Sequence, residues 1–196
     1  MKAINETYEA TFNGLPINTN PVKGLCCHAE VLAALQLIME SMLRRHSKIF
    51  VTMLTIRHPE HYDGQVDFPT FLESFMRYER RHYGDVEYLW RVECNAGTAH
   101  PHWHVILVYD GNKTQMAWSH QQKATEYWAH TLGTDATGLV HVTQTHSPLS
   151  AGDGFMIRRE DKITFQDCFR FCSYIAKVGN NILPGNTRSF GSSMRL

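Results

Sequence analysis

The stretch His102-Trp103-His104-Val105-Ile106-Leu107-Val108-Tyr109 places two histidines one residue apart at the head of an apolar segment. Its aliphatic and aromatic content predicts a β-strand. Successive side chains of a strand point to opposite faces, so His102 and His104 share one face and Trp103 lies on the other. Two neutral imidazoles on one face supply half of a metal site.

A third ligand is expected from the strand that precedes this one. Residues 86–93 alternate regularly, and residues 94–101 have the composition of a hairpin loop. An antiparallel hairpin then brings Glu93 across from His102, and a His/His/carboxylate set leaves positions open for water or a phosphate oxygen. His100 continues the same register and is the alternative third ligand, although the proline after it disfavours regular strand geometry.

Length and composition indicate one soluble domain. The chain has 196 residues, 43% of them hydrophobic, and its formal net charge is zero with histidine neutral. This balance is unlike that of a protein that coats nucleic acid, although it leaves room for a local basic patch. The five cysteines form no CxxC pair, which favours reduced thiols in a cytoplasm.

The N-terminus carries acidic residues and no apolar core of a signal peptide, and no apolar run is long enough to cross a bilayer. We therefore expect a cytoplasmic protein. Residues 1–27 show little periodicity and predict an irregular N-terminal arm, so that residues 28–196 form the domain.

The order of the expected elements indicates the fold class. In chain order they are an amphipathic helix over 28–45, a strand over 48–56 that is apolar on both faces, a helix from Asp67 to about Gly84, the hairpin strands, a helix with a Ser119/Gln122 capping box that ends at Gly133, and a strand over 139–145. After the first helix the order is β-α-β-β-α-β, which predicts an α+β protein with a ferredoxin-like, split antiparallel sheet. Both crossover helices then cover one face, and the other face stays open for a ligand or an added helix.

The C-terminal part predicts a loop over 148–162 and a last helix from Thr164, with Asp167 completing a capping box. Tyr174 and Lys177 lie three residues apart on this helix, so their side chains are neighbours. A cation beside a phenol favours the phenolate and can hold a phosphate oxygen. The alternative is an ordinary amphipathic helix with a half-exposed tyrosine. The tail from Gly179 is expected to lie over the surface.

Five segments together resemble the HUH endonucleases of rolling-circle replication. They are residues 50–55 (FVTMLT), 90–93 (WRVE), 100–107 (HPHWHVIL), 174–177 (YIAK) and 188–193 (RSFGSS). Within that superfamily, residues 28–196 look like the replication-initiation proteins of filamentous phages and related bacterial prophages. The likeness is to the single-tyrosine class, because the last helix offers no second tyrosine.

The resemblance implies that His102, His104 and Glu93 hold Mg²⁺ or Mn²⁺, that Tyr174 is the nucleophile and that Lys177 assists it electrostatically. The implied reaction nicks and joins single-stranded DNA at a replication origin through a 5'-phosphotyrosine link. The implied partners are that DNA and a host helicase and polymerase. Basic side chains are expected to bind phosphates and bases, namely Arg91, Arg158, Arg159 and Arg170.

Two other functions stay open. Twelve histidines make a chance His-x-His pair plausible, and with solvated histidines the chain would be a non-catalytic nucleic-acid-binding module. A metal-dependent hydrolase that activates water is the second, and it would form no covalent adduct.

Overall fold

The structure is a computed structural model that describes residues 6–7, 9–19, 25–59, 67–94, 101–151, 153–178 and 189–194. The N-terminal elements are β1 (Glu6–Thr7), β2 (Thr11–Phe12), β3 (Leu15–Pro16), β4 (Cys27–His28) and α1 (Ala29–Arg45). The central elements are β5 (Lys48–Arg57), α2 (Phe68–Tyr83), β6 (Val86–Glu93), β7 (His102–Asp110), α3 (Ala117–Leu132) and β8 (Val140–Val142). The C-terminal elements are β9 (Gly154–Arg158), α4 (Lys162–Cys172), the 3₁₀ turn η2 (Ser173–Ala176) and β10 (Phe190–Ser192).

One antiparallel sheet runs through the molecule in the order β10-β6-β7-β5-β8, and β9 also pairs with β5. The strand over 48–56 was predicted to be central, and this is confirmed: β5 pairs with β7 along one edge and with β8 and β9 along the other. The predicted hairpin is confirmed too, because Glu93 is the register partner of His102.

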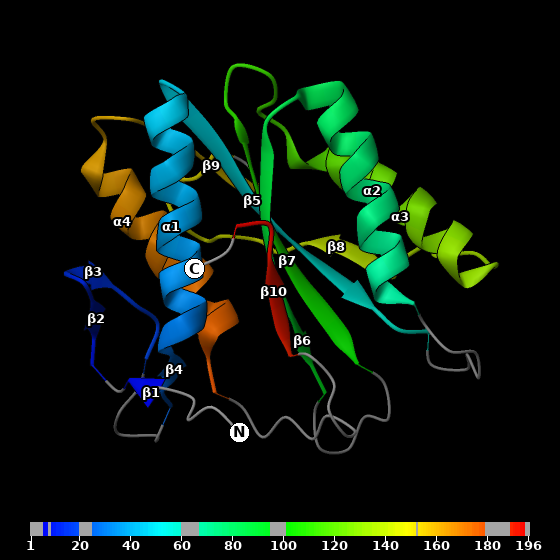
Figure 1. Ribbon diagram of the computed structural model, residues 1–196, viewed down its shortest axis with the longest axis horizontal. Helices are drawn as coiled ribbons and strands as arrows, with labels where there is room; N and C mark the ends of the chain where they lie inside the picture. The colour runs from blue at the N-terminus through cyan, green and yellow to red at the C-terminus, as the bar shows by residue number, and fades with distance from the viewer. Residues whose placement is uncertain are drawn as a thin grey trace.

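Helices cover both faces of the sheet, with α1 and α4 on one side and α2 and α3 on the other (Figure 1). Alternating residues of the strands feed the two cores. On β5, Val51 and Met53 pack toward α1 and α4, whereas Leu54 and Ile56 pack toward α2 and α3. The α+β class is therefore confirmed, and the face that was expected to take a ligand or an added helix carries α1 and α4.

Helix starts depend on side chains that accept hydrogen bonds from the first turn. Asp67 caps α2 as predicted, accepting from the Thr70 amide at 3.0 Å. The boxes predicted for α3 and α4 are wrong. Helix α3 begins at Ala117, before Ser119, whose hydroxyl donates to the Met116 carbonyl instead. Helix α4 is capped by Asp161, which accepts from the Thr164 amide at 3.0 Å.

Three further segments differ from prediction. The expected loop over 148–162 contains β9, because Gly154–Arg158 completes the edge of β5 that the short β8 leaves unpaired. The arm over 1–27 contains short paired strands. Part of the tail forms β10, which pairs with β6, while residues 179–188 lie outside the described residues. No helix in the described part of the chain is both long and apolar enough to cross a membrane.

Candidate metal centre

The candidate metal centre lies where β6 ends and β7 begins. Glu93 is the last residue of β6, and His102 is the first residue of β7, directly opposite it. His104 follows two residues later and therefore projects from the same face, the one covered by α1 and α4. The alternation that buries Trp103 and Val105 against α2 and α3 turns both histidines toward the glutamate.

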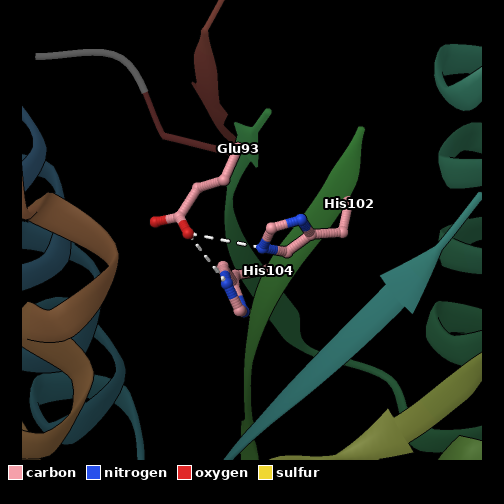
Figure 2. A group of neighbouring side chains, drawn as sticks. All are labelled: Glu93, His102 and His104. Atoms are coloured by element: carbon pink, nitrogen blue, oxygen red, sulfur yellow. Dashed lines mark ion pairs between the residues drawn. The ribbon is translucent and has the colours of Figure 1, made fainter. Parts of the chain in front are cut away.

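The three side chains converge on one point, as Figure 2 shows. Glu93 Oε2 lies 3.3 Å from His102 Nε2 and 3.5 Å from His104 Nε2. One ligand atom from each residue lies within 4.8 Å of the other two. Two imidazole nitrogens and a carboxylate oxygen make a donor set that suits a divalent ion and leaves coordination positions free.

The protonation of these groups fits metal binding as well. Burial raises the pKa of the Glu93 carboxyl, but the nearby imidazoles of His102 and His104 lower it by more. The pKa of Glu93 therefore lies well below the usual range. Glu93 is thus a carboxylate. The Nε2 atom of His104 is buried and has no hydrogen-bond partner among the described residues. A buried polar atom without a partner is costly, and an ion at this point would satisfy it.

The structure describes only one of the two alternatives for the third ligand. Glu93 is in place, as the hairpin predicted. His100 lies outside the described residues.

Tyr174 is brought to this centre from the far end of the chain. Its ring stands edge-on to the ring of His104, with 5.7 Å between the centroids, and 38% of the residue is exposed. The prediction that it lies on the last α-helix is wrong: α4 ends at Cys172, and Tyr174 lies on η2. Two hydrogen bonds tie η2 to the rest of the chain: the Arg91 guanidinium donates to the Ile175 carbonyl at 2.8 Å, and the Ser173 hydroxyl accepts from the Asn18 amide.

Lys177 lies against the face of the phenol ring, with Nζ 4.6 Å from the ring centroid. The two side chains are neighbours, as predicted. Lys177 was expected to lower the pKa of the Tyr174 phenol. The pKa is instead raised, because the phenol is partly buried and because the negative charge of Glu93 lies nearby. In the protein without a metal ion, Tyr174 is therefore a neutral phenol at neutral pH.

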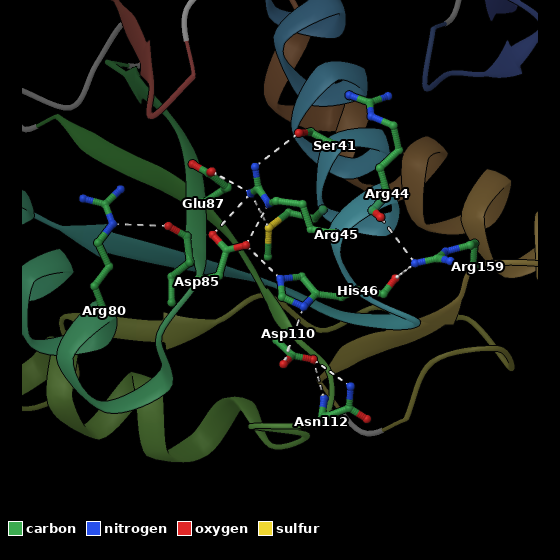
Figure 3. A network of polar contacts seen from close by, with 12 residues as sticks. Ser41, Arg44, Arg45, His46, Arg80, Asp85, Glu87, Asp110, Asn112 and Arg159 are labelled. Atoms are coloured by element: carbon green, nitrogen blue, oxygen red, sulfur yellow. Dashed lines mark hydrogen bonds and ion pairs between the residues drawn. The ribbon is translucent and has the colours of Figure 1, made fainter.

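Two of the four predicted DNA-binding arginines make internal contacts. Arg91 is 3% exposed, and its guanidinium donates to the Ile175 carbonyl. Arg159 donates to the carbonyls of Leu43, Arg44 and His46, where α1 ends. Figure 3 shows its contacts with Arg44 and His46. These guanidinium contacts satisfy carbonyls that a helix end leaves without partners.

Arg158 and Arg170 project into solvent at different places. Arg158 is the register partner of Lys48, at the start of β5. The register partner of His102 is Arg57, at the other end of β5 and nine residues from Lys48. At about 3.3 Å per residue, this separation puts Arg158 roughly 30 Å from the metal centre. Arg170 precedes Tyr174 by one turn and lines a hollow of about 480 Å³ between α4 and residues 144–148.

Arg57 was missed from the sequence. It is exposed, it stands opposite His102 across the sheet, and its side chain makes no ion pair or hydrogen bond within the described ranges. The register of β5 with β7 is the signal that would have revealed it, and sequence reasoning did not predict that register. Arg57, Arg170 and Lys177 together are called the cation group below.

The sequence of the whole described core matches one protein family, the YagK/YfjJ C-terminal domain, over residues 7–193. The chain belongs to this family. No curated protein matches the chain as a relative. The YagK/YfjJ match covers every element described above except Glu6, the first residue of β1, so the candidate metal centre and Tyr174 both lie within the YagK/YfjJ domain.

Proposed function

We propose that this chain is a metal-dependent endonuclease of the HUH type that nicks and rejoins single-stranded DNA, with Tyr174 as the nucleophile. One observation carries the proposal: the ring of Tyr174, on η2, lies with its centroid 5.7 Å from the ring centroid of His104, a member of the His/His/Glu cluster on the sheet. Neither the His/His/Glu pattern nor the tyrosine pattern points to this function on its own, and seventy residues separate His104 from Tyr174 in sequence. Their meeting in space is what a tyrosine nucleophile and a metal-bound phosphate require.

The arrangement of the sheet also supports this proposal. The order β8-β5-β7-β6, with every neighbouring pair antiparallel, is the one we expect from a split β-α-β-β-α-β chain. We therefore interpret β5 to β8 as a ferredoxin-like core. On that interpretation α1, α4 and η2 are additions that carry the tyrosine over the sheet.

The proposed step forms one phosphorus–oxygen bond and breaks another. The Tyr174 Oη attacks the phosphorus in line, forming a phenol ester with the 5'-phosphate, and the bond to the 3'-oxygen breaks. The phenol proton ends on that oxygen, so the products are a 5'-phosphotyrosine and a 3'-hydroxyl, and nothing else is consumed. Because the link keeps a phosphoester, the reverse reaction rejoins the strand.

Each side chain has a separate task in this mechanism. Glu93, His102 and His104 would hold Mg²⁺ or Mn²⁺, which when bound supplies positive charge to a non-bridging phosphate oxygen. Lys177, on the ring of Tyr174, orients the phenol and faces the same phosphate. Arg57, the register partner of His102, and Arg170, one turn before Tyr174, are exposed and would bind the flanking phosphates.

The products suggest the partners. A free 3'-hydroxyl can prime a polymerase, so the proposed setting is a replication origin in a bacterial cytoplasm, with a host helicase and polymerase acting next. A base-paired strand would not reach Tyr174 against the sheet, so the proposed substrate is single-stranded or extruded DNA.

The test is incubation of the full chain with Mn²⁺ and single-stranded DNA from candidate origins, followed by a denaturing gel. We expect a protein band that gains the mass of a DNA fragment. The band should vanish in Tyr174→Phe, which retains the ring and loses the hydroxyl, and in His102→Ala. Arg158→Ala is the matched control, because it removes a distant exposed cation, and it should still form the adduct.

Other outcomes point to the other two functions. Cleavage without an adduct, unchanged in Tyr174→Phe, would mean that the centre activates water. DNA binding with neither cleavage nor adduct would mean a non-catalytic binding module.

A further inference from the structure

His104 is held from behind by two threonine hydroxyls. Thr55 Oγ1 lies 3.0 Å from His104 Nδ1, and Thr143 Oγ1 lies 3.0 Å from Thr55 Oγ1. Thr55 is the register partner of His104, and Thr143 directly follows β8. A chain of hydrogen bonds therefore crosses three neighbouring strands and ends on the ring nitrogen that faces away from Glu93.

The direction of this chain decides which nitrogen of His104 carries its proton. A hydroxyl can both donate and accept, so the Thr55 hydroxyl can accept from the His104 Nδ1–H and donate its own hydrogen to the Thr143 hydroxyl. The opposite direction would put the proton on Nε2. That atom is buried and forms no hydrogen bond in the described part of the structure, and Glu93 Oε2, its polar neighbour, lies 3.5 Å away, beyond the usual N–H···O distance. This disfavours a proton on Nε2.

We propose that Thr55 and Thr143 are positioning residues that hold His104 as the Nδ1–H tautomer, with the lone pair of Nε2 aimed at the metal position. This inference rests on the metal centre of the proposed function. Neither threonine touches the ion or the reacting atoms. They act through His104, because a ligating imidazole needs its other ring nitrogen bonded to keep its tautomer and its orientation.

The two histidines differ in this respect. His104 has the hydroxyl chain behind it, and its side chain is 9% exposed. His102 is 21% exposed, and no hydroxyl contacts its Nδ1 within the described residues. His104 is thus the preorganised ligand, and it is also the one whose ring meets Tyr174. An error in its orientation would disturb both the ion and the nucleophile.

Thr55→Val tests the inference, since valine matches threonine in shape and lacks the hydroxyl. Mn²⁺ affinity of the full chain is measured by calorimetry, and we expect it to fall by about 10-fold to 100-fold. Thr55→Ser, which restores a hydroxyl, should bind Mn²⁺ nearly as wild type does. Thr143→Val should have a smaller effect, because Thr55 remains to accept from Nδ1.

A second measurement needs no metal. Nitrogen NMR of the imidazole rings in the metal-free protein should show His104 protonated on Nδ1 in wild type and a mixture of tautomers in Thr55→Val. A purely structural threonine would leave the tautomer unchanged, and that result would overturn the inference, as would wild-type Mn²⁺ affinity in Thr55→Val. If wild type bound no Mn²⁺ while the NMR result held, the proposed metal centre alone would be wrong.

Discussion

Arg91 allows a quantitative test of how the site is assembled. Its guanidinium is 3% exposed and donates at 2.8 Å to the Ile175 carbonyl, one residue after Tyr174. Arg91→Met keeps much of the side-chain length and removes this donor. Hydrogen bonds to charged groups contribute about 1.5–3 kcal/mol, and the abandoned carbonyl would be buried, so we expect the free energy of unfolding to fall by about 2–3 kcal/mol.

Urea denaturation followed by circular dichroism measures this loss. With a denaturant slope of about 2 kcal/mol per molar urea for a domain of this size, the midpoint should fall by about 1–1.5 M. Arg158→Met is the control, because Arg158 is exposed and distant, and it should change the stability by about 0.5 kcal/mol or less. An Arg91→Met midpoint equal to that of wild type would refute the reasoning that this arginine ties η2 to the sheet.

Three further predictions concern the ion, the phenol and the DNA. Glu93→Gln keeps the shape of the ligand and loses its charge, so calorimetry should show Mn²⁺ affinity lower by on the order of 100-fold, and an unchanged affinity would exclude Glu93 as a ligand. Folding raises the pKa of the Tyr174 phenol, so the stability that this group contributes is present below the unfolded pKa and is lost as pH rises through the folded pKa. An absorbance titration of wild type against Tyr174→Phe should therefore place this ionisation above that of free tyrosine, and a value below it would mean that Lys177 dominates. Finally, three phosphate contacts from the cation group predict that the logarithm of DNA affinity falls with the logarithm of salt with a slope of about −2. A slope near −6 would require cations elsewhere.

The hairpin and its ligands could be predicted because their signals are local. The alternation of apolar residues in 86–93 and 102–109 predicts the face of the sheet on which each side chain lies, and the loop between the two strands predicts their register. Glu93, His102 and His104 therefore came together as expected. Helix α2 was equally predictable, since its cap and its proline lie within four residues of each other.

The missed features depend on partners distant in sequence. Strand β9 has only five residues, and they become a strand because β5 presents an unpaired edge. Arginine is almost never fully buried, so no sequence rule would have placed Arg91 inside the molecule. Tyr174 and Arg57 reach the site through tertiary pairing, which helical or strand periodicity cannot reveal.

Strand β6 links the two halves of the candidate site. Glu93 and Arg91 are two residues apart on it and share one face, so the same strand carries a metal ligand and the side chain that holds η2. A second tie, from the Val178 amide to the Cys26 carbonyl at 2.8 Å, holds the other side of η2. The separation of Tyr174 from the metal position is therefore set by a paired strand rather than by a loop. A site built on such a rigid element keeps its geometry without substrate, which is what an in-line attack requires.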